Sequence, residues 1–435
     1  MDADLQTAFA ASVAHEQGTR RLPSLTAMVG RSGVPLAAAA AGFADIENRV
    51  PATLGHRYRI GSITKTFTAA VTLLLRERGE LELEAPVGRY LTETPFGRLP
   101  VRMLLSHSSG MQREAPVDMW ESMKGPSGQE LREAFGRIEL IAAPGERWHY
   151  SNLGYAVLGQ IIEQVTTVSC ELLIDEMLLA PLELTATNWS MPDGAAIGYR
   201  LDPFADAVYR EPALEQGAVG VGGQLWSTAE DLLRWGDVLC GNRPDIIPTA
   251  VVDAMHTLQV MVDTRSWKQG WGLGLILERH DVGILAGHTG AMPGFQAALT
   301  LHRDSSTVAV ALSNLTHGTV LSDLTTRAVL DSIASAAATP TLAWEPAAPC
   351  PDHLRPILGS WWSESEETVF EWRHDGLHAH LTANPAASET RFEEEAPGRF
   401  RASHGRLRGE LLIISGTAES VRLHWATYPF TRRPR

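Results

Sequence analysis

The sequence predicts an α+β protein in which helices flank an antiparallel sheet, with a helical subdomain and a small separate β domain at the C-terminal end. Three observations support this prediction. Residues 62–78 carry an apolar helical pattern, and from Trp271 onward the pattern changes to short alternating or apolar runs separated by turns. Prolines then concentrate between residues 340 and 356, which indicates a linker before a further domain.

The N-terminal elements follow from hydrophobic spacing and turn residues. Residues 3–17 have a helical pattern, and two apolar runs on either side of the turn at 31–33 are typical of paired strands. The helix predicted from Ser62 is apolar on most of its sides and ends at Gly79, which is typical of a helix at the centre of a domain. Residues 100–250 are mainly helix and loop.

The later elements define the domain boundaries. Between Trp271 and residue 314 the apolar runs are short and predict an antiparallel meander, which a helix at 321–337 follows. We therefore predict a first domain at residues 1–338, a Pro-rich linker at 339–356 and a small β domain at 357–435.

Composition and charge exclude several classes of protein. The chain has 435 residues, a formal net charge of −14 and 44% hydrophobic residues, and this negative balance argues against binding nucleic acid or an anionic membrane surface. The three scattered cysteines imply no disulfide framework, and we expect no metal and no cofactor. The chain shows no secretory signal pattern and no apolar run long enough to span a membrane, so we expect a cytoplasmic protein.

Ser62 and Lys65 form the first candidate catalytic pair. Residues three apart share one face of a helix, so this hydroxyl and ammonium can meet. A buried lysine loses proton affinity through desolvation and can serve as a base toward serine, whereas arginine cannot deprotonate. The chain holds only two other lysines, Lys124 and Lys268, so a lysine in an apolar helix is unusual here. The alternative is a serine that caps the helix and an incidental lysine.

Tyr150 and Asn152 form the second candidate group, just before and at the start of the clearest predicted helix, at 153–167. A phenol near an ammonium loses its proton more easily and can transfer one. The amide of Asn152 can hold a substrate carbonyl or bridge to Lys65. In the alternative interpretation, Asn152 is a helix N-cap and Tyr150 is a half-buried core residue.

His288, Thr289 and Gly290 form the third candidate group. The segment follows one apolar strand and precedes another. A strand edge in such a place can lie beside a substrate and point a backbone N–H group at an oxyanion. Taken alone, His288 is better explained as a histidine at the end of a strand.

In this order and at these separations, the Ser-x-x-Lys, Tyr-Ser-Asn and His-Thr-Gly motifs resemble those of the serine penicillin-recognising enzymes. Within them the chain is most similar to the branch that holds class C β-lactamases, D-stereospecific peptidases and related esterases. The resemblance covers roughly residues 5–335 and includes the stretches "LPVRMLLSHSSGM" and "GGQLWSTAEDLLRW". It implies a β-lactamase/transpeptidase-like fold. Many relatives have lysine where His288 stands, which favours peptidase, esterase and acyl-transfer activity over β-lactamase activity.

The resemblance also implies a role for each catalytic candidate. Ser62 would be the nucleophile that forms an acyl-enzyme, and Lys65 and Tyr150 would be the proton-transfer pair. Asn152 would orient the substrate. His288 would hold the carboxyl side of the substrate or transfer protons.

Further positions are expected to contact the substrate. The backbone N–H groups of Ser62 and Ala291 would form the oxyanion hole. Thr289, Gly290 and Trp226 would contact the substrate, although core packing is the default expectation for the tryptophan.

Among these enzymes the chain looks most like the penicillin-binding-protein-type thioesterases, which are stand-alone cytoplasmic enzymes. The resemblance rests on length, on the histidine of the third motif, and on a small C-terminal domain that resembles lipocalin-like β domains. It implies that the enzyme offloads a nonribosomal peptide with a D-configured C-terminal residue and closes it head to tail. The substrate would be a peptidyl ester or thioester, which a peptidyl carrier protein would present.

Two alternatives stay open. The first is a cytoplasmic esterase, a D-aminopeptidase or D-Ala-D-Ala carboxypeptidase, or a weak β-lactamase. The second is a non-catalytic relative that binds ligands in the same cleft, although a binding module has no need of a titratable lysine. His107 could also partner a serine, but its "SHSSG" segment matches a structural stretch of the family, so we assign it a structural role.

Overall fold

The structure is a computed structural model that describes residues 3–202, 207–316, 321–337, 350–373, 376–405, 407–417 and 420–434. The chain divides into two compact units, Met1–Thr339 and Pro340–Arg435, and each has a hydrophobic core of its own. Most of the predicted linker, including Pro340, Pro346 and Pro349, lies outside the described residues.

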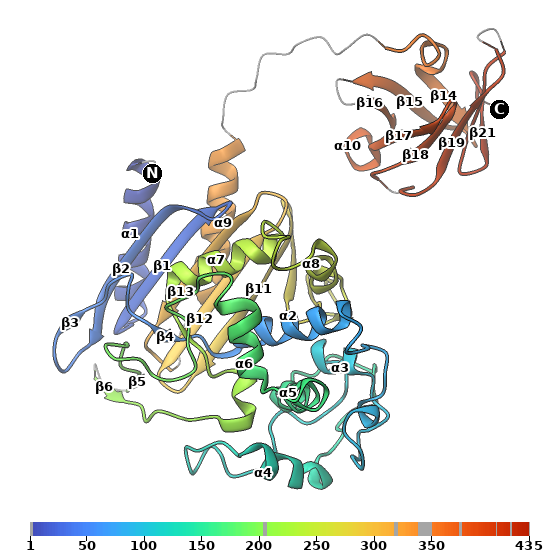
Figure 1. The fold of residues 1–435 in the computed structure, drawn as a ribbon. Coiled ribbons are helices and arrows are strands. Elements are labelled where there is room, and N and C mark those ends of the chain that lie inside the picture. The colour runs from blue at the N-terminus through green and yellow to red at the C-terminus, as the bar shows by residue number, and fades with distance from the viewer. Residues whose placement is uncertain are drawn as a thin grey trace. The chain divides into compact units, whose positions relative to one another are not determined.

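A nine-stranded antiparallel sheet forms the centre of the first unit (Figure 1), in the order β3-β2-β1-β13-β12-β11-β10-β9-β8. Its strands are β1 (Ser24–Arg31), β2 (Val34–Asp45), β3 (Val50–Pro51), β8 (Val260–Met261), β9 (Gln269–Trp271), β10 (Ile276–His280), β11 (Gly283–Met292), β12 (Phe295–His302) and β13 (Thr307–Ser313). Strands β10 to β13 are neighbours in chain order and pair antiparallel, which confirms the predicted meander.

Helices cover both faces of this sheet, because side chains of a strand alternate between two apolar clusters. Ala27 and Val29 of β1 join the cluster of α1 (Ala3–Thr19) and α9 (Leu321–Ala337). Met28, between them, joins the larger cluster on the other face, where α7 (Ala229–Cys240) packs against β1, β12 and β13.

The helical subdomain is built around α2 (Thr64–Glu77), whose residues from Thr64 to Leu75 are all buried. It packs against α5, α6 and α8. The helices of this region are α3 (Val101–Leu105), α4 (Gly128–Glu133), α5 (Asn152–Thr166), α6 (Cys170–Ile174) and α8 (Thr249–His256). The helix predicted at 153–167 and the buried central helix are both present.

Short elements connect these layers. The short helical segments are η1 (Gly61–Ile63), η2 (Val87–Arg89), η3 (Phe135–Arg137), the π-helical η4 (Asp175–Leu179) and η5 (Gly217–Gly222). The short strands are β4 (Tyr58–Arg59), β5 (Tyr199–Leu201), β6 (Val208–Arg210) and β7 (Trp226–Ser227). Over the described residues, no single helix is both long and apolar enough to cross a membrane. Two helical segments joined by a bend, Asn152–Thr166 and Cys170–Leu179, meet the length and hydropathy criteria when they are taken together. Most of the first segment, α5, is buried in the core of the first unit.

The second unit is an eight-stranded antiparallel sheet with its strands in chain order. The elements are η6 (Arg355–Ile357), β14 (Gly359–Ser363), β15 (Glu366–Arg373), β16 (Gly376–Leu381), α10 (Pro385–Ser388), β17 (Thr390–Ala396), β18 (Arg399–Ala402), β19 (Leu411–Ser415), β20 (Arg422–Trp425) and β21 (Tyr428–Phe430). Two backbone hydrogen bonds between Trp362 and Thr431 join the first strand to the chain just after the last one. The sheet therefore closes into a small barrel, which agrees with the predicted β domain.

Candidate active site

Ser62 lies in η1, a single 3-10 turn in front of α2. The helix itself begins at Thr64, two residues later than predicted. Gly61 makes this arrangement possible with a φ of 51° and a close approach to β11, since a Cβ atom on it would come 2.7 Å from the backbone nitrogen of Ala291. A Cβ atom on Gly290 would similarly meet the carbonyl oxygen of Ile60 at 1.9 Å. The two glycines thus bring the nucleophile turn and β11 into direct contact.

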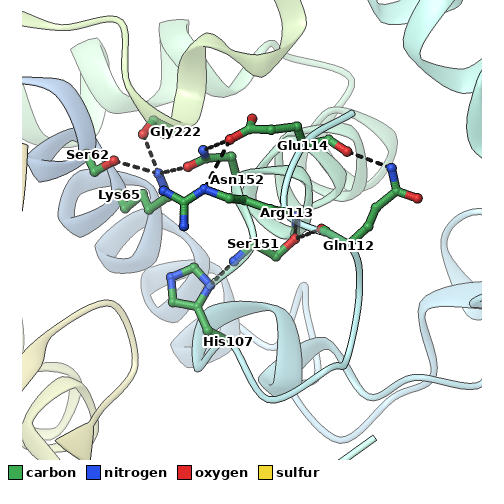
Figure 2. Close-up of polar contacts among 10 residues, drawn as sticks. Ser62, Lys65, His107, Gln112, Arg113, Glu114, Ser151, Asn152 and Gly222 are labelled. Carbon is green, nitrogen blue, oxygen red and sulfur yellow. Dashed lines mark hydrogen bonds and ion pairs between the residues drawn. The ribbon is translucent and has the colours of Figure 1, made fainter. Parts of the chain in front are cut away.

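Lys65 is fully buried in the first turn of α2, with 0% of its surface exposed. Its Nζ lies 3.0 Å from Ser62 Oγ, 2.7 Å from Asn152 Oδ1 and 2.7 Å from the carbonyl oxygen of Gly222 (Figure 2). Desolvation lowers the pKa of the ammonium to about 7, while Glu114 raises this pKa and Arg113 lowers it further. A neutral Lys65 donates to the amide and the carbonyl, and its lone pair is free to accept the Ser62 proton.

Asn152 is held by charged partners at both ends of its amide. Oδ1 accepts from Lys65, and Nδ2 donates to Glu114 Oε1 at 2.7 Å (Figure 2). Asn152 is therefore the bridge to Lys65 and not a helix N-cap, because that cap is Ser151, whose Oγ accepts from the backbone N–H group of Gly154. Burial raises the pKa of the Glu114 carboxyl, and its Oε2 is buried without a described partner.

Tyr150 is half-buried in the loop before α5, and the Lys65 Nζ lies 5.0 Å from its ring centroid. The expectation that the ammonium would make this phenol more acidic is wrong. Desolvation raises the pKa of Tyr150 well above its ordinary value, although the Ser62 side chain and the Arg113 charge oppose the shift. Tyr150 therefore holds its proton at neutral pH and is placed to donate it.

His288 lies inside β11, where its pairing with Leu299 of β12 is part of an unbroken register. The prediction that the motif falls between two strands is therefore wrong, because β11 continues to Met292. Burial, followed by the Lys65 charge, lowers the pKa of His288 to about 3. The imidazole is neutral, and its Nδ1–H donates to the Thr289 carbonyl oxygen at 2.6 Å, which leaves Nε2 as a buried lone pair without a described partner.

His107 packs against the Tyr150 ring and has the structural position that we expect for it. The residue is fully buried, and its Nδ1 accepts from the backbone N–H group of Ser151 at 3.1 Å (Figure 2). Its ring centroid lies 4.2 Å from that of Tyr150. Desolvation lowers the pKa of His107 well below its ordinary value. A neutral imidazole thus positions both the tyrosine and the start of α5.

One cavity of about 510 Å³ brings most of the candidates together. Its lining includes Ser62, Tyr150, Asn152, His288, Thr289, Gly290 and Ala291, with Arg113, Glu114, Trp120, Trp148, Trp271 and Ile276. Among the described residues, no group of three or more histidines, cysteines and acidic residues is placed to hold a metal ion.

The predicted contact of Trp226 with the substrate is wrong. The structure buries Trp226 in β7, where it stacks edge-on against Phe295 outside this cavity. Conversely, sequence reasoning missed Arg113 and Glu114, which begin three residues after the end of the "SHSSG" segment. Nothing in their local pattern marks them, and only the tertiary fold brings them beside Lys65.

This arrangement can perform acyl transfer through Ser62. A hydroxyl lies within proton-transfer distance of a lysine whose pKa is near 7, and a second, protonated donor stands beside it. Ser62 is partly exposed to the cavity, so a substrate carbonyl can reach it. The contact between η1 and β11 places the backbone of Ala291 next to Gly61, the residue before Ser62, so the N–H groups of Ser62 and Ala291 can face one oxyanion.

Comparisons with known proteins agree with this geometry. The Beta-lactamase family model matches residues 9–333, and a domain of unknown function (DUF7586) matches residues 350–432. Beta-lactamase-like protein 2 of Dictyostelium discoideum is 30% identical over 234 residues, which is 50% of this chain and 42% of that protein. Esterase EstB of Burkholderia gladioli is 29% identical over 297 residues, covering 59% of this chain and 75% of the esterase. The chain thus spans less than half of the first relative's length.

Solved structures share the fold. SurE is similar with a TM-score of 0.64 and 23% identity over 99% of this chain and 100% of its own. The D-amino acid amidase of Ochrobactrum anthropi SV3, complexed with D-phenylalanine, has a TM-score of 0.67 and 23% identity, covering 77% of this chain and 100% of its own. At these identities the similarity establishes the β-lactamase/transpeptidase-like fold.

Proposed function

The chain belongs to the Beta-lactamase family, which includes serine hydrolases, and we propose that its own reaction is acyl transfer from a peptidyl thioester. In this proposal Ser62 is the nucleophile, Lys65 and Tyr150 transfer protons, and Asn152 holds Lys65 in place. Ser62 and Ala291 stabilise the oxyanion through their backbone N–H groups. The product is a head-to-tail cyclised nonribosomal peptide.

A neutral His288 is the observation that favours this acyl donor. An enzyme that recognises a free carboxylate beyond the scissile bond needs a cation there, and an imidazole with a pKa of about 3 supplies none at neutral pH. Among the described residues that line the cavity, Arg113 is the only permanent cation, and its Nε lies 3.5 Å from the Glu114 carboxylate. The site therefore suits acyl donors with an uncharged leaving group, such as thioesters and esters.

The acylation step uses the protons already in the site. As Ser62 Oγ attacks the thioester carbonyl, its proton passes to neutral Lys65 and a C–O bond forms. When the C–S bond breaks, the departing sulfur takes the proton of Tyr150, which recovers one from the Lys65 ammonium. The net result is an acyl-serine, a free thiol and Lys65 returned to its neutral form.

The second step requires an amine instead of water. Glu114 lines the cavity beside Asn152 and offers the amine a nearby carboxylate. The tryptophans at 120, 148 and 271 line the same cavity with apolar surface, which can hold a folded peptide and limit access of water. Attack by the peptide's own amino group forms the amide, breaks the ester C–O bond and returns a proton to Ser62.

We further propose that the residue attached to Ser62 is D-configured and that a peptidyl carrier protein presents the peptide. The similarity to a D-amino acid amidase complexed with D-phenylalanine supports the first point. A carrier-bound donor places the reaction in the cytoplasm, which is the location we propose.

The test uses peptidyl thioesters of N-acetylcysteamine in matched pairs. One pair differs in a D- or L-configured C-terminal residue, and a second pair has a free or an acetylated N-terminus. We expect thiol release from the D-configured substrates and a cyclic product, identified by mass, only with the free N-terminus. The proposal is refuted if the enzyme cleaves simple esters rapidly but leaves the thioesters unreacted. It is also refuted if the thioesters give only linear acids.

The second candidate is an esterase or D-aminopeptidase, which the similarity to esterase EstB and the partial exposure of Ser62 favour. Such an enzyme lets water attack the acyl-serine, so it would release linear acids from the same thioesters. Carboxypeptidase and β-lactamase activities are less well supported, because they act on substrates with a carboxylate that His288 cannot pair. A non-catalytic relative would leave Ser62 unlabelled by a fluorophosphonate probe.

A further inference from the structure

The barrel of the second unit contains a cavity of its own, with a volume of about 280 Å³. The cavity lies where β14 ends at Ser363, β15 begins at Glu366 and β20 turns into β21. The opposite end of β14 is closed by η6, because the Trp361 Nε1–H group donates to the Ile357 carbonyl oxygen at 2.6 Å and Ile357 is fully buried. The barrel is thus closed at one end and hollow at the other.

The inner wall of this cavity combines apolar side chains with hydroxyl groups and His380, and it contains an unpaired hydrogen-bond donor. Trp425, Phe430, Leu381 and Leu407 line it. Trp425 is 7% exposed, yet its Nε1–H group has no described partner. A buried indole N–H group without an acceptor is destabilising, so a ligand atom that accepts this hydrogen bond would bind here with a gain in free energy.

The mouth of the cavity is acidic. Glu364 lies in the turn after β14 and Glu366 is the first residue of β15. Both are exposed, and neither forms an ion pair among the described residues. None of the described residues that line the cavity is a lysine or an arginine. Tyr428, opposite Trp425 in the register of β20 and β21, adds a second aromatic ring at this rim.

We propose that this cavity binds a small organic cation, made of an amine, an aromatic or short apolar body, and a hydrogen-bond acceptor at the far end. The carboxylates of Glu364 and Glu366 attract the amine, and the aromatic rim favours a cation over an anion. The apolar body fills the space beside Trp425 and Phe430, and the acceptor takes the Trp425 N–H group. The same charges disfavour fatty acids and other anions.

The experiment titrates the full chain with three ligands that differ only in one terminal group: tyramine, tyrosol and 4-hydroxyphenylacetate. All three carry a phenolic oxygen for Trp425, and their charges are positive, zero and negative. By isothermal titration calorimetry we expect tyramine to bind at least tenfold more tightly than 4-hydroxyphenylacetate, with tyrosol between them.

Substitutions assign the binding to this cavity. The double variant Glu364→Gln and Glu366→Gln should weaken tyramine about tenfold and leave tyrosol unchanged, and Trp425→Phe should weaken both. Glu393→Gln, exposed on β17 and not part of the cavity lining, is the matched control and should have no effect. The proposal is wrong if none of the ligands binds, if the anion binds as well as the amine, or if the double variant keeps the full preference for tyramine.

Discussion

Acylation should be controlled by the titration of Lys65, because only its neutral form can accept the Ser62 proton. With a pKa of about 7, the neutral fraction rises from about a tenth at pH 6 to about nine tenths at pH 8. We therefore expect kcat/KM for an activated ester to rise about tenfold over this interval and then level off. A lysine with an ordinary pKa would give about a hundredfold rise with no plateau.

Two neighbouring residues should move this profile in opposite directions. Glu114 raises the pKa of Lys65 and Arg113 lowers it, so Glu114→Gln should shift the midpoint to lower pH and Arg113→Gln to higher pH. The measurement is the midpoint of kcat/KM against pH for a p-nitrophenyl ester, because either substitution can also change the plateau. Glu133→Gln, an exposed carboxylate on α4, is the control. Shifts of the same sign, or a rate without a titration near pH 7, would refute the assignment of Lys65 as the base.

Three further predictions concern the nucleophile, the contact between η1 and β11, and the third motif. Ser62→Ala should lower ester hydrolysis on the order of 10⁴-fold or more and abolish fluorophosphonate labelling, and labelling that persists would place the nucleophile elsewhere. Gly290→Ala should destabilise the protein by about 1–3 kcal/mol in urea unfolding, since its Cβ atom would meet the Ile60 carbonyl oxygen at 1.9 Å. Gly18→Ala, with open space around it in α1, should instead be neutral or stabilising. The third motif is tested by the ratio of kcat/KM for a D-peptide with a free C-terminal carboxylate to kcat/KM for the same peptide with a C-terminal amide. His288→Lys should raise this ratio at least tenfold, and an unchanged ratio would show that His288 does not determine the selectivity between the two peptides.

Most of the fold could be predicted from the sequence because its patterns are local. The short apolar runs after Trp271 became the meander β10 to β13, and the helix that is apolar on most sides became the buried α2. The boundary errors have local causes as well. Residue spacing places Ser62 in the helix, because spacing does not distinguish a 3-10 turn from the first turn of an α-helix.

The electrostatics of the site could not be predicted, because they depend on burial and on residues far apart in the sequence. The expected proximity of Lys65 to Tyr150 favours a more acidic phenol, yet desolvation outweighs the nearby charges and raises the pKa of Tyr150. Glu114 lies next to Arg113 in an unremarkable loop, and its importance follows only from the hydrogen bond to Asn152. Trp226 lies in a segment that matches the family, but its ring packs into the core.

The neutral His288 and the titrating Lys65 are two parts of one electrostatic arrangement. The Lys65 charge contributes to lowering the pKa of His288, and by reciprocity a permanent cation at position 288 would lower the pKa of Lys65 below about 7. An uncharged imidazole avoids that repulsion and keeps the lysine half-protonated near neutral pH. It also removes the cation that a carboxylate-bearing substrate would need. In the reaction that we propose, a neutral residue at position 288 would therefore serve two purposes: it adds no repulsion to the Lys65 ammonium, and it favours an acyl donor with an uncharged leaving group.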